Sequence, residues 1–262
     1  MNNDLLTIGG FTVHGYGLMI AIGVFAAYFI AEYRAGRKGM DKDNVFSLLM
    51  WALISGYIGS KLLFIITILP DIINGTAVLE NILSGWVVYG GIIGGVAGIL
   101  LMCRIKKIDF WQYIDLTAPS MAIAQGFGRI GCLLAGCCYG IPTDSAFAIT
   151  FHNSHYAPNN IPLVPTQIIS SVLDFINALI LLWLDRNKKC EGQTMAWYLI
   201  FYSIGRFALE YLRGDLDRGS VGILSTSQFI SIFTLIFGIV ILVVRTRLYN
   251  NKNAKNSVKG GE

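Results

Sequence analysis

The chain has 262 residues, of which 54% are apolar and only 14% are charged, and its formal net charge is +4. Soluble globular domains carry about 25% charged residues, so this composition excludes an ordinary soluble domain and a disordered chain. The small positive charge does not indicate a nucleic-acid partner. The composition instead predicts a membrane protein, because a bilayer core about 30 Å thick requires helices of about 20 apolar residues.

The sequence contains seven apolar stretches of about that length, and we expect an all-α integral membrane protein with seven transmembrane helices. In chain order the expected spans are 15–33, 45–69, 85–103, 110–127, 165–184, 194–212 and 225–244. Residues 1–249 should form a single seven-helix membrane domain, and residues 250–262 a flexible cytoplasmic tail. No cleavable signal peptide is expected, because no basic residue precedes the first span.

The basic residues predict the orientation of these helices. Fifteen of the twenty follow the first, third, fifth or seventh span: Arg34, Arg37, Lys38, Lys42, Arg104, Lys106, Lys107, Arg186, Lys188, Lys189, Arg245, Arg247, Lys252, Lys255 and Lys259. Such loops face the cytoplasm, so the amino terminus should lie outside and the carboxyl terminus in the cytoplasm. Five cations do not follow this rule and need another explanation: Lys61, Arg129, Arg206, Arg213 and Arg218.

The stretch GFGRIGCLLAGCCYG, residues 126–140, places Arg129 among glycines and cysteines. Gln125, Arg129 and Cys132 have the spacing of one helical face. We expect a frayed or broken helix end here that offers amide groups and a guanidinium to an anion. An arginine fork can bind two phosphate oxygens at once. The surrounding glycines, which are Gly126, Gly128 and Gly131, have close helix packing as an alternative role. Packing alone does not explain Arg129.

The stretch YSIGRFALEYLRGDLDRG, residues 202–219, places four polar residues on one face of the sixth span. Tyr202, Arg206, Glu210 and Arg213 follow one another at spacings of four, four and three. Glu210 can orient a neighbouring arginine, or accept a proton if burial raises its pKa. The alternative is a charge pair that only compensates its own burial. We favour a functional role, because ionisable residues within a membrane are costly to maintain.

Four other positions carry weaker signals. Tyr16 begins the first span, where an interfacial aromatic is the commoner use. Tyr89 precedes the paired glycines of the third span. Lys61 has the alternative of extending its ammonium toward the interface. Asp174 lies near the middle of the fifth span as a hidden polar contact, with no assigned role.

Three cysteines, Cys132, Cys137 and Cys138, form a C-x4-C-C pattern on the outer side. With His152 or His155 they can bind zinc, although the spacing is not a standard one. A disulfide in an oxidising exterior is a second possibility. Packing as small apolar side chains is favoured, so neither a metal nor a cofactor is expected.

Five motifs in order resemble the bacterial prolipoprotein diacylglyceryl transferases. They are HGYGLM at 14–19, YGGIIGG at 89–95, GRIGCLLAGCCYG at 128–140, PTQ at 165–167 and GRFALEYLR at 205–213. The resemblance implies a multi-pass enzyme of the bacterial inner membrane in lipoprotein biosynthesis. Such an enzyme moves the diacylglyceryl group of phosphatidylglycerol to the thiol of a lipobox cysteine and releases glycerol phosphate. The implied partners are phosphatidylglycerol and lipobox-containing prolipoproteins.

The resemblance also implies a site. The expected catalytic residues are Arg129, Arg206, Glu210 and Tyr89. The expected substrate-binding residues are Tyr16, Gly128, Gly131, Cys132, Gln167, Arg213 and Lys61.

Four positions depart from the family pattern. Tyr89 stands where the family usually has a histidine, Cys132 replaces an asparagine, Ser170 a glutamate and Lys61 an arginine. The missing histidine leaves the base for the attacking thiol open between Glu210 and Tyr89. These departures keep a second hypothesis in view, a non-catalytic or repurposed relative that binds anionic phospholipid or modifies a different acceptor. The oligomeric state does not follow from the sequence.

Overall fold

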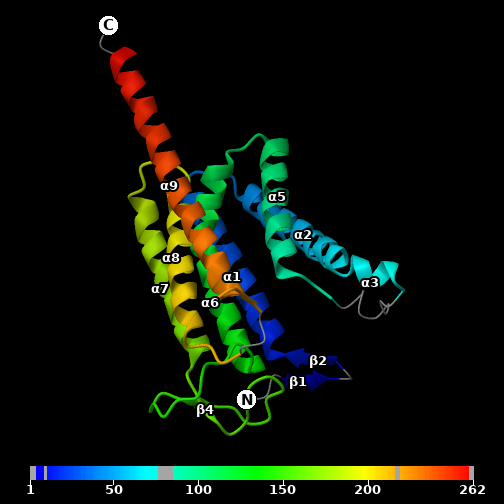
Figure 1. Ribbon diagram of the computed structural model, residues 1–262. Helices are drawn as coiled ribbons and strands as arrows, with labels where there is room; N and C mark the ends of the chain where they lie inside the picture. Colours follow the sequence, from blue (N-terminus) through cyan, green and yellow to red (C-terminus); the bar gives the residue numbers. More distant parts are fainter. Residues whose placement is uncertain (1–3, 9–10, 76–84, 216–218, 260–262) are drawn as a thin grey trace. The chain divides into compact units, whose positions relative to one another are not determined.

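The computed structural model describes residues 4–8, 11–75, 85–215 and 219–259 (Figure 1). Contacts divide the chain into two compact units. The first consists of Met1–Ala31 and Ile114–Glu262, and the second of Glu32–Tyr113. Each unit is described by itself below.

The described residues are almost entirely helical. The helices are α1 (Gly15–Arg37), α2 (Lys42–Thr67), α3 (Leu69–Ile73), α5 (Val88–Lys106), α6 (Phe110–Ala135), α7 (Thr166–Arg186), α8 (Gln193–Glu210) and α9 (Thr226–Lys259). Five described helices, α1, α2, α5, α7 and α9, are long and apolar enough to cross a membrane. The chain is therefore a helical, multi-pass membrane protein, as its composition predicted.

The expected spans match the long helices, with two differences in extent. Helix α6 continues to Ala135, well past the expected end at residue 127. Helix α9 continues to Lys259, so residues 250–259 are helical. Helices α6 and α8 coincide with the fourth and sixth expected spans, but they are less apolar than the five helices named above. Polar side chains such as Asp115, Gln125, Ser203 and Arg206 account for their lower hydropathy.

Three short antiparallel strand pairs connect the helices. They are β1 (Asp4–Ile8) with β2 (Phe11–His14), β3 (Ile149–Thr150) with β4 (Pro162–Leu163), and β5 (Ser220–Val221) with β6 (Leu224–Ser225). The segment between α6 and α7 has a small apolar core of Phe151, Ala157 and Leu163. Its backbone is joined to the chain after α8, since Ile141 N donates to Leu212 O at 3.0 Å.

A buried carboxylate joins α6 to the start of α8 in the first unit. Asp115 is fully buried and accepts hydrogen bonds from Gly192 N at 2.7 Å and Met195 N at 2.8 Å. The Lys188 ammonium donates to the same carboxylate at 3.0 Å. An anion at a helix amino terminus satisfies free amide groups and the helix dipole. This contact fixes the register of α6, and therefore the position of Arg129 about 21 Å further along it.

Glycines bring α2 and α5 together in the second unit. A Cβ atom on Gly59 would lie against Gly90 O and 2.9 Å from Gly94 Cα, and one on Gly94 would lie against Ser55 O. All of these neighbouring atoms belong to the backbone, which cannot rotate away as a side chain can. The two helices approach so closely only because these positions lack a side chain.

We expect Gly59→Ala to lower the free energy of unfolding by about 1–3 kcal/mol, because the added methyl group meets backbone atoms. The matched control is Gly95→Ala on α5, where a Cβ atom would have only an ordinary contact of 3.5 Å with Ala52 O. The measurement is thermal unfolding of the detergent-solubilised protein. Equal stabilities of the two variants would show that the close approach does not limit the packing.

Candidate functional site

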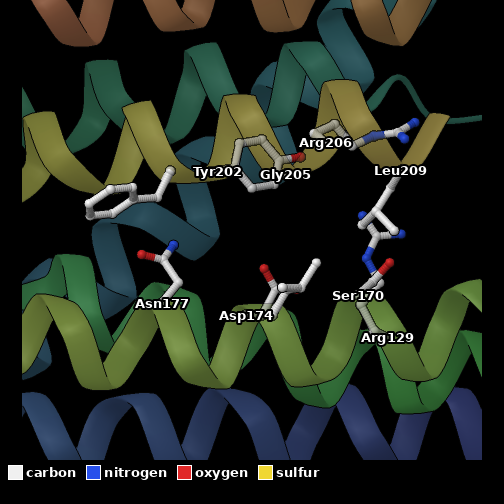
Figure 2. A pocket seen from close by; sticks show the side chains of 10 residues that line it. Arg129, Ser170, Asp174, Asn177, Tyr202, Gly205, Arg206 and Leu209 are labelled. Carbon is white, nitrogen blue, oxygen red and sulfur yellow. The ribbon is translucent and has the colours of Figure 1, made fainter. Parts of the chain in front are cut away.

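The first unit contains a cavity between α7 and α8 whose lining includes several polar and charged side chains. Figure 2 shows Ser170, Asp174 and Asn177 on α7 facing Tyr202 and Arg206 on α8. The lining residues are Arg129, Ser170, Leu173, Asp174, Asn177, Phe201, Tyr202, Gly205, Arg206 and Leu209. The cavity has a volume of about 40 Å³, which is room for about three waters.

A second, adjoining cavity shares four of these lining residues. Its lining consists of Arg129, Cys138, Thr166, Gln167, Ser170, Arg206, Leu209 and Arg213. Three of the five cations that orientation left unexplained, Arg129, Arg206 and Arg213, therefore lie along one cavity. They come from α6, from α8 and from the chain after α8. The sequence placed them on separate segments, and the fold brings them together.

Two of the three arginines already have anionic partners. Arg206 Nη1 donates to Glu210 Oε2 at 2.5 Å, and its Nη2 donates to Ser227 Oγ at 2.5 Å. Arg213 binds Asp215 through both Nε and Nη2, at 2.8 and 2.7 Å. Glu210 thus orients Arg206, which is one of the two roles predicted for it.

Arg129 has a different environment. Its side chain is half-buried, and it forms no ion pair with any carboxylate in the described part of the chain. Asp174 is the acidic residue that shares its cavity. Asp174 is close enough to Arg129 for electrostatic interaction, but no carboxylate oxygen pairs directly with the guanidinium in the described residues. A partly buried guanidinium without a direct ion pair is costly, because it has lost water without gaining a paired carboxylate. Such a group can bind an incoming anion at low additional cost.

Charge is also concentrated at the end of the second cavity, outside the spans. Burial lowers the pKa of the Arg213 guanidinium, but the hydrogen bonds to Asp215 and the neighbouring Cys138 raise it above its ordinary value. Hydrogen bonds from the Cys132 and Cys137 thiols lower the pKa of Cys138, and Arg213 lowers it further. This end of the cavity therefore places the Arg213 cation beside the Cys138 thiol.

The expected break in the helix at Gly126–Gly131 is wrong. Helix α6 is continuous through these residues, so their amide groups are not offered to a ligand by a broken end. Packing explains two of the three glycines. A Cβ atom on Gly126 would lie 2.7 Å from the Phe175 ring, and one on Gly131 3.2 Å from the Tyr16 ring. Gly128 has no such neighbour within 4 Å.

Among the remaining predicted residues of the first unit, Gln167 lines the second cavity. Gln167 is 1% exposed, and its Nε2 donates to Cys137 O at 2.8 Å. Tyr16, at the start of α1, is close enough to Arg129 and Cys132 for electrostatic interaction. Gln167 therefore positions the chain after α6, and Tyr16 lies beside the arginine.

Lys61 and Tyr89 belong to the second unit. Lys61 Nζ donates to Gly85 O at 3.1 Å and lies 4.5 Å from the centre of the Trp86 ring. Tyr89 is in the first turn of α5 and is 45% exposed. Their roles in a substrate site stay predictions.

The α7 face of the cavity was not assigned a role by the sequence analysis. Ser170, Asp174 and Asn177 line it, and Asn177 Oδ1 is buried without a hydrogen-bond partner in the described ranges. Four polar residues of α7 follow one another at spacings of four, four and three, as in α8: Thr166, Ser170, Asp174 and Asn177. That matching periodicity was the available signal, because two polar faces of equal spacing can form a common cavity.

Comparison with known proteins agrees with this architecture. The family model described as prolipoprotein diacylglyceryl transferase matches residues 3–244. A phosphatidylglycerol–prolipoprotein diacylglyceryl transferase of Clostridium tetani is 46% identical over 92% of this chain and 96% of its own length. A second such transferase, from Clostridium perfringens, is 45% identical over 97% of both chains. One from Staphylococcus saprophyticus is 32% identical over 93% of this chain and 89% of its own. The chain belongs to the prolipoprotein diacylglyceryl transferase family.

The different environments of the arginines predict opposite stability effects. We expect Arg129→Met to leave the free energy of unfolding unchanged or to raise it, since it removes a half-buried cation that lacks a carboxylate partner. We expect Glu210→Gln to lower it by about 1.5–3 kcal/mol, since Arg206 loses a charged hydrogen bond. Thermal unfolding in detergent, without added lipid, measures both. A clear loss of stability in Arg129→Met would show that Arg129 serves the fold.

Proposed function

We propose that the cavity lined by Arg129, Arg206 and Arg213 binds the phosphate of phosphatidylglycerol for transfer of its diacylglyceryl group to a prolipoprotein cysteine. The observation that carries this proposal is the convergence of three guanidinium groups on one cavity, with Arg129 lacking a carboxylate partner. The names of the similar proteins supply the lipid and the acceptor. In this proposal the acyl chains lie along the apolar outer faces of the helices.

We also propose that all seven long helices cross the bacterial cytoplasmic membrane, with the amino terminus outside. The polar side chains that lower the hydropathy of α6 and α8 include Arg129, Tyr202 and Arg206, which line the cavity. Those helices can therefore span a bilayer while their polar faces avoid lipid. The basic residues at and just beyond the carboxyl-terminal ends of α1, α5 and α7, and those in the last part of α9, support this orientation.

Reporter fusions test this topology. An alkaline phosphatase fused after residue 156, between α6 and α7, should be active because the enzyme folds only outside the cytoplasm. The matched fusion after Lys189, between α7 and α8, should be inactive. The reverse pattern would contradict the proposed orientation. Activity at both positions would show that α7 does not cross.

The proposed reaction is a displacement at a glycerol carbon. The acceptor sulfur forms a bond to the carbon, and the carbon–oxygen bond to the phosphate breaks, so that glycerol phosphate leaves with the electron pair. Negative charge grows on the phosphate as this bond breaks. Arg129 and Arg206 would accelerate the step if their contacts tighten with that charge, because only interactions stronger in the transition state lower the barrier. Glu210 would hold Arg206 in position.

The thiol proton has two proposed acceptors, Glu210 and Tyr89. The Glu210 carboxylate is engaged by Arg206, which favours an orienting role over proton transfer. A tyrosine hydroxyl is a weaker proton acceptor than the imidazole of histidine, which is the most common general base in proteins. Neither side chain replaces a histidine well, so the activation of the thiol needs a further contribution.

We expect purified protein, incubated with phosphatidylglycerol and a lipobox peptide, to add the mass of a diacylglyceryl group to the peptide. Arg129→Ala and Arg206→Ala should each lower kcat/KM at least about a hundredfold, by the loss of transition-state charge stabilisation. Arg104→Ala, on the basic side of α5, is the matched control and should retain activity. Mass spectrometry of the peptide and release of glycerol phosphate measure the two products.

Three results would contradict the proposal in different ways. Folded protein that yields neither product, while still binding phosphatidylglycerol, would favour a non-catalytic binder. Glycerol phosphate released with an unmodified peptide would favour a different acceptor. Full activity in both arginine variants would separate the chemistry from this cavity.

A further inference from the structure

Three thiols come together beside the arginine-lined cavity. The Sγ atoms of Cys132, Cys137 and Cys138 all lie within 4.8 Å of one another, and none of the three forms a disulfide. Cys132 is in the last turn of α6, and the other two follow that helix. Gly136 and Cys138 have φ values of +73° and +61°, in the left-handed region that favours glycine. The chain thus turns back sharply enough to place the later thiols beside the first.

Buried side chains of α7 hold this turn in place. Gln167 Nε2 donates to Cys137 O and Thr166 Oγ1 donates to Cys138 O, both at 2.8 Å. Gln167 and Thr166 are 1% and 3% exposed. Cys137 N also donates to Cys132 O at 3.1 Å. The backbone is therefore anchored through its carbonyl groups. The Cys137 thiol donates to Cys132 O at 3.7 Å, and the three sulfur atoms are held close together as a prearranged set.

We propose that Cys132, Cys137 and Cys138 bind a Zn²⁺ ion as three thiolate ligands, and that the acceptor thiol of the substrate occupies its fourth position. This inference rests on the proposed function. Zinc prefers tetrahedral sulfur ligands at about 2.3 Å, which places the sulfur atoms about 3.8 Å apart, within reach of the present arrangement. Three protein ligands with one open position is the pattern of catalytic zinc sites, whereas structural sites have four.

The position of the cluster suits that role. Cys138 lines the second cavity together with Arg129, Arg206 and Arg213. A sulfur atom bound to the ion would therefore lie beside the proposed phosphate site. Three thiolates and Zn²⁺ carry one net negative charge. Arg129 interacts electrostatically with Cys132, and Arg213 with Cys138, so this charge is compensated.

The ion would supply the activation that the reaction lacks. A thiol that coordinates Zn²⁺ loses its proton, which would pass to the base of the proposed mechanism. The zinc-bound sulfur then forms the bond to the glycerol carbon, and the bond from that carbon to the phosphate oxygen breaks toward the arginines. The product thioether is a weaker ligand than a thiolate and leaves the ion. Cys132 would thus take part in activating the acceptor.

Cobalt substitution tests the site without relying on activity. With a phosphine reductant present, the purified protein should bind one Co²⁺ per chain and show thiolate-to-cobalt charge-transfer absorption with tetrahedral d–d bands. Zn²⁺ should displace the cobalt. Cys132→Ser, Cys137→Ser and Cys138→Ser should each weaken binding at least about tenfold. Cys103→Ser and Cys190→Ser, outside the cluster, are the matched controls and should bind as the unmodified protein does.

A lipobox peptide tests the fourth position. The peptide with cysteine should shift the d–d bands of the cobalt protein, and the same peptide with serine should not. Absence of cobalt binding by the unmodified protein, or equal binding by all five variants, would overturn the metal site. Cobalt binding without a peptide-dependent shift would overturn the role of the acceptor thiol.

The transfer assay on the same preparation separates this inference from the proposed function. Transfer by protein that binds no metal would reject the zinc site and leave the transferase intact. A cobalt site that responds to the peptide, in protein that releases no glycerol phosphate, would support the metal site and reject the transfer.

Discussion

Removing a guanidinium group from water costs free energy, and this cost constrains the structure of the first unit of this protein. Three arginines line one cavity between apolar helices, and the surrounding chain compensates two of them through Glu210 and Asp215. Arg129 has no equivalent carboxylate among the described residues. A fold selected for stability alone would replace it with an apolar residue, since buried charges rarely improve stability. This is the reason for our proposal that a lipid phosphate pairs with Arg129.

The precision of this site depends on contacts far from the arginines. Asp115 attaches α6 to the start of α8 and so sets the height of Arg129 against Arg206. At the other end, Thr166 and Gln167 attach the start of α7 to the chain that follows α6. Both anchors use buried side chains that bond to backbone groups. The cavity is consequently bordered by rigid helices whose registers are fixed at both ends, which is what a site for a small charged group requires.

The sequence predicted the class of structure because hydropathy acts over whole helices. The seven apolar stretches correspond to the seven long helices, and the cations that violated the orientation pattern led to the arginine cavity. Local details were less accessible. The close contacts of Gly126 with Phe175 and of Gly131 with Tyr16 involve residues that lie far away in the sequence. Asp174 and Asn177 gained significance only when α7 and α8 were placed face to face, because one polar residue on an isolated helix has several possible partners.

The cysteines show most clearly what spacing cannot reveal. A C-x4-C-C pattern lacks the regular separation of known zinc sites, and the sequence therefore favoured packing. Its three-dimensional arrangement depends on a left-handed residue at Cys138 and on hydrogen bonds from α7 to the carbonyl groups beside the thiols. Those interactions cross about 30 residues of chain and leave no local pattern. The same turn that gathers the thiols also borders the arginine cavity, so a bound acceptor and a bound phosphate would meet at one place. A substitution of Thr166 or Gln167 would therefore displace the bound acceptor and the bound phosphate together. In the proposed reaction these two residues of α7 are positioning residues for the acceptor and for the lipid.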